Sequence, residues 1–348
     1  MKNIKKVADK IIKEKKIIIF ADSDLDGVSS SIILKKSIEA VGGSVSVYIS
    51  NIEEWGRGLT PKAVSFMQKE SPALLITLDC GISNFKGVED AKKAGFSVIV
   101  IDHHDPFEKL PVADIILNPK QKDDDYPFKN MANVGVTFSL TKEILKEKFL
   151  LFRRSFLEIT ALATVADMVP REEDNKKILD EGLLLLEKPQ LPALRVLKER
   201  VEEDFVQKAV SLLNITEMRG SVNDCFLFLS AEDEETARNM LEELFEAKKK
   251  REKEISAAIE SVTKNISEDD VIVFEGGSFP SYFCGTIAYR VIKNFKRPTF
   301  IYTKGEEISR GSVRVPSGIN AIEAMSFCSE YLLDFGGHPP AAGFVVSN

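Results

Sequence analysis

Short apolar runs alternate with helical stretches over residues 15–120 of the chain. The runs are KKIIIF, SVSVYIS, ALLITLDC, SVIVIDHH and ADIILNP. Each run is long enough for one buried strand, and the segments between them have helical spacing, such as GVSSSIILKKSIEAVGG with its stop at Gly42. Continuous apolar strands that alternate with helices are typical of a parallel sheet covered on both faces. The pattern therefore predicts an α/β fold.

The rest of the chain predicts helices and then a second, smaller α/β domain. Residues 131–220 have mostly helical spacing, with one helix expected to end at Pro170. Residues 232–267 are charged and contain neither Gly nor Pro, which predicts one long helix. The segments DVIVFEGG, RPTFIYTKG and ISRGSVRV predict further strands. The expected division is a first domain over 1–225, a connector helix over 226–267 and a smaller domain over 268–348.

Acidic residues and histidines follow three of the predicted strands. They are Asp22, Asp24, Asp26, Asp79, Asp102, His103 and His104. Open α/β sheets bind ligands at the carboxyl ends of their strands, so these side chains are expected to converge. Crowded carboxylates repel one another, and burial penalises each of them unless something neutralises it. A cation site at this edge explains the cluster better than an Asp-rich turn does.

Composition excludes several other classes of protein. The apolar fraction of 44% is ordinary for a globular chain, and the apolar runs fall short of a membrane span. The basic N-terminal segment is interrupted by acidic residues and predicts an amphipathic helix instead of a signal peptide. The four cysteines lack CxxC spacing, which favours a reducing cytoplasm over a zinc or disulfide framework. A net charge of −7 leaves room for nucleic acid only in a local groove.

The chain has only three histidines, and the acidic cluster is dominated by oxygen ligands. Oxygen ligands with a single imidazole suit Mn²⁺ or Mg²⁺ better than structural zinc. A shared carboxylate could hold two such ions about 4 Å apart, the arrangement used for displacement at phosphorus. The residues thus point to phosphoester chemistry.

The motifs DSDLDG, LDCG, DHH and VADMVP, in this order, resemble the four motifs of the DHH phosphoesterase family. RGSVRVPSGINAIEAM and FGGHPPAAGF resemble its DHHA1 domain. LNPKQKDDDYPFKNMANVGVTFSL and the segment that starts SAEDEETARNMLEELFEAKKKREKE are similar to the RecJ-like exonuclease branch. The resemblance implies a parallel-sheet DHH domain (1–225), a long connector helix (226–267) and a smaller α/β DHHA1 substrate-binding domain (268–348).

The resemblance also implies roles for individual residues in hydrolysis. The family's metal ligands match Asp24, Asp26, Asp79, His103 and Asp167. Asp79 would bridge two ions, His104 would contact substrate phosphate, and Asp102 would orient His103. Asp22 is a further candidate ligand, because this chain has Phe20 where some members of the family have a histidine.

In the DHHA1 region the resemblance implies a phosphate-binding strip. Backbone N–H groups of Gly336 and Gly337 would approach a phosphate closely, because glycine has no side chain in the way. Charge would come from His338, Arg310 and Arg314, and Arg219 is a weaker candidate for a further phosphate contact.

The leading expectation is a Mn²⁺-dependent exonuclease with two ions, for which Mg²⁺ is an alternative, that hydrolyses single-stranded DNA or RNA to mononucleotides. The sequence ends soon after AAGF and shows no OB-fold, which makes short oligonucleotides more plausible substrates. The alternatives are a phosphodiesterase for nano-oligonucleotides or cyclic dinucleotides, and a non-catalytic replication-associated scaffold. A cytoplasmic protein with possible replication or repair partners is expected; polarity, DNA-or-RNA preference and oligomeric state stay open.

Overall fold

The computed structural model describes residues 1–201, 203–214, 217–267 and 269–348. The chain divides into two compact units, Met1–Glu246 and Ala247–Asn348, and the division falls within helix α12 (Glu234–Thr263). Among the described helices, none is both long enough and apolar enough to cross a membrane.

The first unit is built on a parallel five-stranded sheet with the order β2-β1-β3-β4-β5. The strands are β1 (Lys16–Ala21), β2 (Ser44–Ile49), β3 (Leu74–Leu78), β4 (Ser97–Ile101) and β5 (Ile115–Leu117). All five predicted strands are confirmed, and so is the parallel sheet. Because β1 lies between β2 and β3, the strand order reverses beside β1, where open α/β sheets leave a crevice for a ligand.

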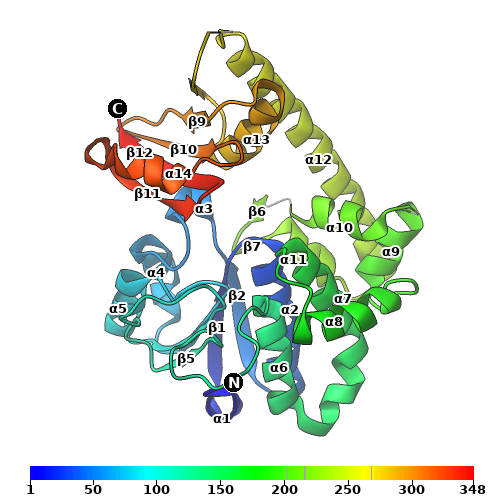
Figure 1. Ribbon diagram of the computed structural model, residues 1–348. Helices are drawn as coiled ribbons and strands as arrows, with labels where there is room; N and C mark the ends of the chain where they lie inside the picture. The colour runs from blue at the N-terminus through cyan, green and yellow to red at the C-terminus, as the bar shows by residue number, and fades with distance from the viewer. Residues whose placement is uncertain (202, 215–216, 268) are drawn as a thin grey trace. The chain divides into compact units, whose positions relative to one another are not determined.

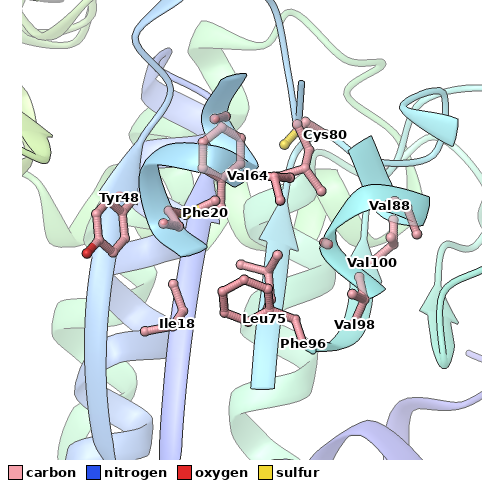
Figure 2. Packing of buried hydrophobic residues seen from close by; sticks show 14 of the residues in the cluster. Ile18, Phe20, Tyr48, Val64, Leu75, Cys80, Val88, Phe96, Val98 and Val100 are labelled. Atoms are coloured by element: carbon pink, nitrogen blue, oxygen red, sulfur yellow. The ribbon is translucent and has the colours of Figure 1, made fainter. Parts of the chain in front are cut away.

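Helices cover both faces of this sheet, as its continuous apolar strands require (Figure 1). On one face, Ile18, Leu75 and Val98 pack in a buried cluster with α4 (Pro61–Met67) and α5 (Phe85–Lys93), as Figure 2 shows. On the other face, α2 (Leu25–Ala40) and α6 (Asn133–Leu145) contact the strands. These two helices hold much of the site described below.

The remainder of the first unit is mostly helical, as predicted. Its further elements are α1 (Ile4–Lys13), α3 (Ile52–Trp55), α7 (Phe149–Ala166), α8 (Glu173–Leu185), α9 (Pro192–Arg200), α10 (Phe205–Leu213), the hairpin β6 (Met218–Arg219) and β7 (Val222–Asn223), α11 (Asp224–Leu229), and the short 3₁₀ turns Gln68–Glu70 and Lys146–Lys148. The helix expected to end at Pro170 already ends at Ala166. The long charged helix is confirmed as α12 but begins only at Glu234, because α11 is a separate helix.

The second unit contains a mixed five-stranded sheet with the order β11-β12-β10-β9-β8. Its elements are β8 (Val273–Gly277), α13 (Cys284–Phe295), β9 (Thr299–Thr303), β10 (Ile308–Arg314), α14 (Ala321–Ser326), β11 (Leu332–His338), β12 (Ala341–Ser347), and the 3₁₀ turns Ser281–Phe283 and Ser329–Tyr331. The three predicted strands are confirmed as β8, β9 and β10. Sequence analysis did not predict β11 and β12, because their glycines and the Pro339–Pro340 pair are typical of a loop.

Candidate active site

Asp24 and Asp26 lie where β1 passes into α2, and each fixes the start of a helix. Asp24 is the N-cap of α2, and its Oδ1 accepts hydrogen bonds from the N–H groups of Asp26 (3.0 Å) and Gly27 (3.1 Å). Both oxygens of the buried Asp26 accept N–H groups from the start of α6, those of Asn133 and Val134, each at 2.7 Å. The acidic motif is thus held by helix N-termini, which favour negative charge.

Asp79 directly follows β3 and lies at the centre of the cluster. Its backbone φ of 59° is in the left-handed region, where Asp and Asn are tolerated better than most residues. The side chain is 4% exposed, and its Oδ1 lies 3.2 Å from His103 Nε2. Within the described residues this oxygen has no hydrogen-bond partner. Burial, followed by the charge of Asp26, raises the pKa of Asp79 well above its usual range.

The ring of His103 presents an unprotonated nitrogen to two carboxylates. Nδ1 lies 2.9 Å from the carbonyl oxygen of Met131, which can only accept, so Nδ1 carries the proton and donates it. Burial lowers the pKa of His103 to about 4, which keeps the ring neutral at pH 7. Nε2 therefore directs a lone pair toward Asp79 Oδ1 (3.2 Å) and Asp26 Oδ2 (3.9 Å). A cation placed among these atoms would satisfy all three.

Asp167 reaches the same cluster from the end of α7. Its Oδ2 lies 3.7 Å from His103 Nδ1, and within the described residues this buried oxygen has no hydrogen-bond partner. Burial and the charge of Asp24 raise the pKa of Asp167 to about 7. Asp79 and Asp167 thus each provide an unsatisfied buried oxygen, which is the donor set that a hard divalent cation requires.

Asp102 orients His104, and the prediction that it orients the ring of His103 is wrong. The Oδ1 of Asp102 accepts a hydrogen bond from the ring nitrogen Nδ1 of His104 (2.8 Å). From His103 it accepts the backbone N–H (2.8 Å) and makes no hydrogen bond with the ring. The hydrogen bond that His104 donates to Asp102 raises the pKa of His104, although burial opposes it. The His104 side chain is 59% exposed, so its ring is accessible at the edge of the cluster.

The predicted ligands fall into three sets that are linked by Asp79 and His103. Within each of three sets, one possible ligand atom per residue lies within 4.8 Å of the others. The sets are Asp22, Asp24 and Asp79; Asp26, His103 and Asp167; and Asp79, His103 and His104. Asp79 belongs to the first and third sets, and His103 links the second and third. This is the arrangement expected if Asp79 lies between two cations, with Asp22 beside the first.

The raised pKa values give a pH dependence to cation binding. Burial and the charge of Asp24 raise the pKa of Asp22 to about 6, and Asp167 titrates near 7. Below these values the oxygens carry protons that a cation must displace. We expect Mn²⁺ affinity to fall as the pH falls from 8 to 5.5, by about tenfold per pH unit for each displaced proton. Calorimetry in buffers of different ionisation enthalpy would measure the release; affinity independent of pH would contradict it.

Sequence analysis missed two cations at this edge, Arg57 and Lys120. Arg57 is exposed in the loop after α3, and its charge lowers the pKa of Asp22. Lys120 follows β5, lies 3.2 Å from Asp105, and lowers the pKa of Asp167 by its charge. Both residues could have been found from the sequence, because they follow the predicted strands β2 and β5. The carboxyl ends of these strands lie at the same edge as those of the strands with acidic ends.

The second unit places its five predicted phosphate contacts on β10 and β11, the two strands that flank β12. Arg314 is paired with Ala341, and Ala341 with His338, so Arg314 and His338 lie on one face of the sheet. Arg310 lies on this face as well, four positions along β10. A Cβ at Gly336 would meet nothing within 4 Å, whereas Gly337 has a φ of +147° and a crowded Cβ position. Gly336 is therefore the open part of the strip.

Arg219 lies in the first unit and is already engaged in ion pairs. Its guanidinium contacts Asp224 and Glu243, the latter at 2.5 Å. A phosphate would have to compete with two carboxylates for this side chain, so its predicted phosphate contact stays a prediction.

Loss of a charge on the strip should weaken substrate binding with little effect on turnover. We expect Arg310→Ala and His338→Ala to raise KM by about three- to tenfold, as exposed charged contacts do, with kcat nearly unchanged. Steady-state kinetics on a labelled strand would separate the two constants. A fall in kcat at constant KM would instead place these side chains at the reacting phosphate.

Residues 16–164 match the model of the DHH family, N-terminal domain, and this part of the chain is therefore a DHH-family domain. Nearly the whole chain is homologous to the single-stranded-DNA-specific exonuclease RecJ. It is 31% identical to RecJ of Bacillus subtilis, over 99% of this chain and 46% of that protein. It is 30% identical to RecJ of Dickeya dadantii, over 94% of this chain and 63% of that protein. The chain thus spans about half to under two thirds of these relatives.

Solved structures show the same fold. A crystal structure of exonuclease RecJ bound to manganese matches 99% of this chain and 90% of its own, with a TM-score of 0.84 and 24% identity. RecJ of Thermus thermophilus with Mn²⁺ matches 99% of this chain and 52% of its own, with a TM-score of 0.81 and 24% identity. These matches agree with the mixed α/β architecture and both sheets described above.

Proposed function

We propose that this protein is a divalent-cation-dependent exonuclease that hydrolyses single-stranded DNA. The neutral His103 carries the proposal, because its Nε2 lone pair faces Asp79 and Asp26 with no proton of its own to offer. A purely structural cluster has no need for such an arrangement, which speaks against the scaffold alternative. The similar RecJ proteins are exonucleases specific for single-stranded DNA, which supports DNA as the substrate.

Two cations would divide the ligands between them. Asp22, Asp24 and Asp79 would hold one ion, and Asp26, His103 and Asp167 the other, with Asp79 between them. When bound, the ions polarise the phosphodiester and lower the pKa of the attacking water. Mn²⁺ is the proposed ion and Mg²⁺ the alternative, since oxygen ligands with one imidazole suit both.

The side chains around the ions would position the substrate. His104, held by Asp102 and raised in pKa, would donate a hydrogen bond from its outward ring nitrogen to a phosphate oxygen. In the second unit, Arg310, Arg314 and His338 would contact phosphates farther along the strand. The proposal includes a division of the chain into a DHH domain, a connector and a DHHA1 substrate-binding domain. It also includes a cytoplasmic location.

A digest of end-labelled strands in Mn²⁺ tests the proposal. DNA and RNA of matched sequence, from dinucleotides to long strands, would be resolved on a gel with the label at either end. We expect mononucleotides to be released from long DNA strands. Cleavage confined to the shortest oligonucleotides would favour the nano-oligonucleotide alternative, and an inert protein in Mn²⁺ and in Mg²⁺ would overturn the assignment.

A further inference from the structure

Arg57 lies at the β2 end of the acidic edge and is held there by its loop. The N–H of Ser50 donates to the carbonyl of Ala21 (2.8 Å), which keeps the chain after β2 beside the end of β1. Trp55, two residues before Arg57, has its ring 6.4 Å from that of Phe20. The chain on the N-terminal side of Arg57 is thus packed against the strand that leads into Asp22.

The loop is fixed on its other side by Asn84. The Oδ1 of Asn84 accepts the N–H of Leu59 (3.2 Å) and that of Gly81 (3.0 Å), which joins the loop to the segment just after Asp79. Gly58 has a φ of +70°, and a Cβ there would lie 2.8 Å from Asn84 Nδ2. Only glycine fits this position comfortably. The backbone that carries Arg57 is therefore tied to both β1 and β3.

The contacts of the Arg57 side chain within the described residues do not explain why its backbone is held at this position. It is exposed, and its guanidinium has no hydrogen bond or ion pair with any residue that the structure describes. Its charge reaches Asp22, whose pKa it lowers. Lys120, at the β5 end of the same edge, differs because it already has Asp105 at 3.2 Å. An unpaired guanidinium beside a cation site is suited to a second anion.

We propose that Arg57 binds a phosphate of the nucleic-acid strand that adjoins the scissile phosphate, on the β2 side of the cation cluster. The inference rests on the proposed function and deepens it, because it gives the site a phosphate subsite of its own within the first unit. A substrate with several phosphates then gains a contact that a lone phosphoester cannot make. Arg57 is a binding residue in this proposal and takes no part in bond cleavage.

Kinetics of Arg57→Gln across a salt series test the proposal. Each neutralised phosphate on a single strand contributes about 0.7 to the slope of log affinity against log salt. We expect the variant to raise KM by about three- to tenfold and to reduce that slope by about 0.7, with kcat nearly unchanged. Arg57→Lys should restore the slope, because it keeps the charge. Lys13→Gln removes an exposed charge at the opposite end of the sheet and should change neither quantity.

Two parallel measurements separate this role from others. Mn²⁺ affinity by calorimetry should change much less than KM, because burial and Asp24 outweigh Arg57 in setting the pKa of Asp22. A change in Mn²⁺ affinity as large as the change in KM would show that Arg57 acts through the carboxylates and would overturn the proposal. The proposal would also be overturned if Arg57→Gln left KM and the salt slope unchanged. A lower Tm of this variant would overturn it too, because the side chain would then serve to hold the loop. Anisotropy with a hydrolysis-resistant phosphorothioate strand repeats the comparison without turnover. If the wild type binds this strand but cleaves no strand, the proposed exonuclease activity is refuted. The binding of wild type and Arg57→Gln can still be compared, so the role of Arg57 is tested independently.

Discussion

Asp79→Asn should lower kcat by roughly a thousandfold or more in saturating Mn²⁺, beyond the 10- to 100-fold typical of losing a group behind the metal ligands. The substitution removes the charge that lies between the two ligand sets and leaves the shape of the side chain. Asparagine is the right replacement because the φ of 59° at this position is tolerated by Asn and would strain Ala. We expect the fold to survive, since burial already raises the pKa of Asp79.

Initial rates on a labelled DNA strand, with Mn²⁺ binding by calorimetry, would measure the effect. Asp9→Asn is the matched control, because it makes the same change on the exposed face of α1. Turnover of Asp79→Asn within tenfold of the wild type would exclude Asp79 as a shared ligand. A loss of turnover together with a collapse of Tm would instead assign the residue to folding.

Gly27→Ala should disable the site through the backbone. Gly27 lies in the first turn of α2, and a Cβ there would lie 2.9 Å from both the N and C atoms of Asp22, and closer still to its carbonyl oxygen. These are backbone atoms that cannot move aside cheaply. We expect a loss of about 3 kcal/mol in the free energy of unfolding, the upper end for an overpacked site. The displaced turn carries Asp24 and Asp26, and a 1 Å shift there should cost about a hundredfold in activity.

Gly135→Ala provides the matched control on another buried helix. Its Cβ would meet Met131 Cε at 3.0 Å and Ile178 Cδ1 at 3.5 Å, both at the ends of flexible side chains. The gain in helix propensity, about 1 kcal/mol, should offset this crowding. Denaturant unfolding and strand hydrolysis would be compared for the two variants. Equal stability of both would show that α2 can shift away from Asp22 without cost.

The sequence by itself determined the framework of the first unit. Its five apolar runs are strands β1 to β5, because a parallel strand buried on both faces leaves a continuous apolar signal. The acidic residues after β1, β3 and β4 could be expected to converge for the same reason, since parallel strands present their carboxyl ends at one edge. Both inferences depend only on local pattern and on a general rule of topology.

The cation cluster needed the tertiary structure, because its geometry joins segments far apart in the chain. Met131 fixes the proton of His103, and the start of α6 holds both oxygens of Asp26. No local pattern announces a backbone carbonyl or N–H as a partner, since every residue has them. The wrong role for Asp102 has the same origin: its neighbours His103 and His104 are equivalent in sequence, and only their ring directions separate them.

The position of Arg57 at the acidic edge and the existence of strands β11 and β12 were likewise found only in the tertiary structure. Arg57 stands between two glycines in a segment that is typical of a loop, and its place at the acidic edge depends on Asn84, which ties that loop to the segment after β3. The glycines of β11 and β12 lie within paired strands, and the two prolines lie in the turn between them, where no ladder hydrogen bond is required. Apolar periodicity records which residues are buried, whereas hydrogen bonds and charge contacts between distant segments leave no periodic trace in the sequence.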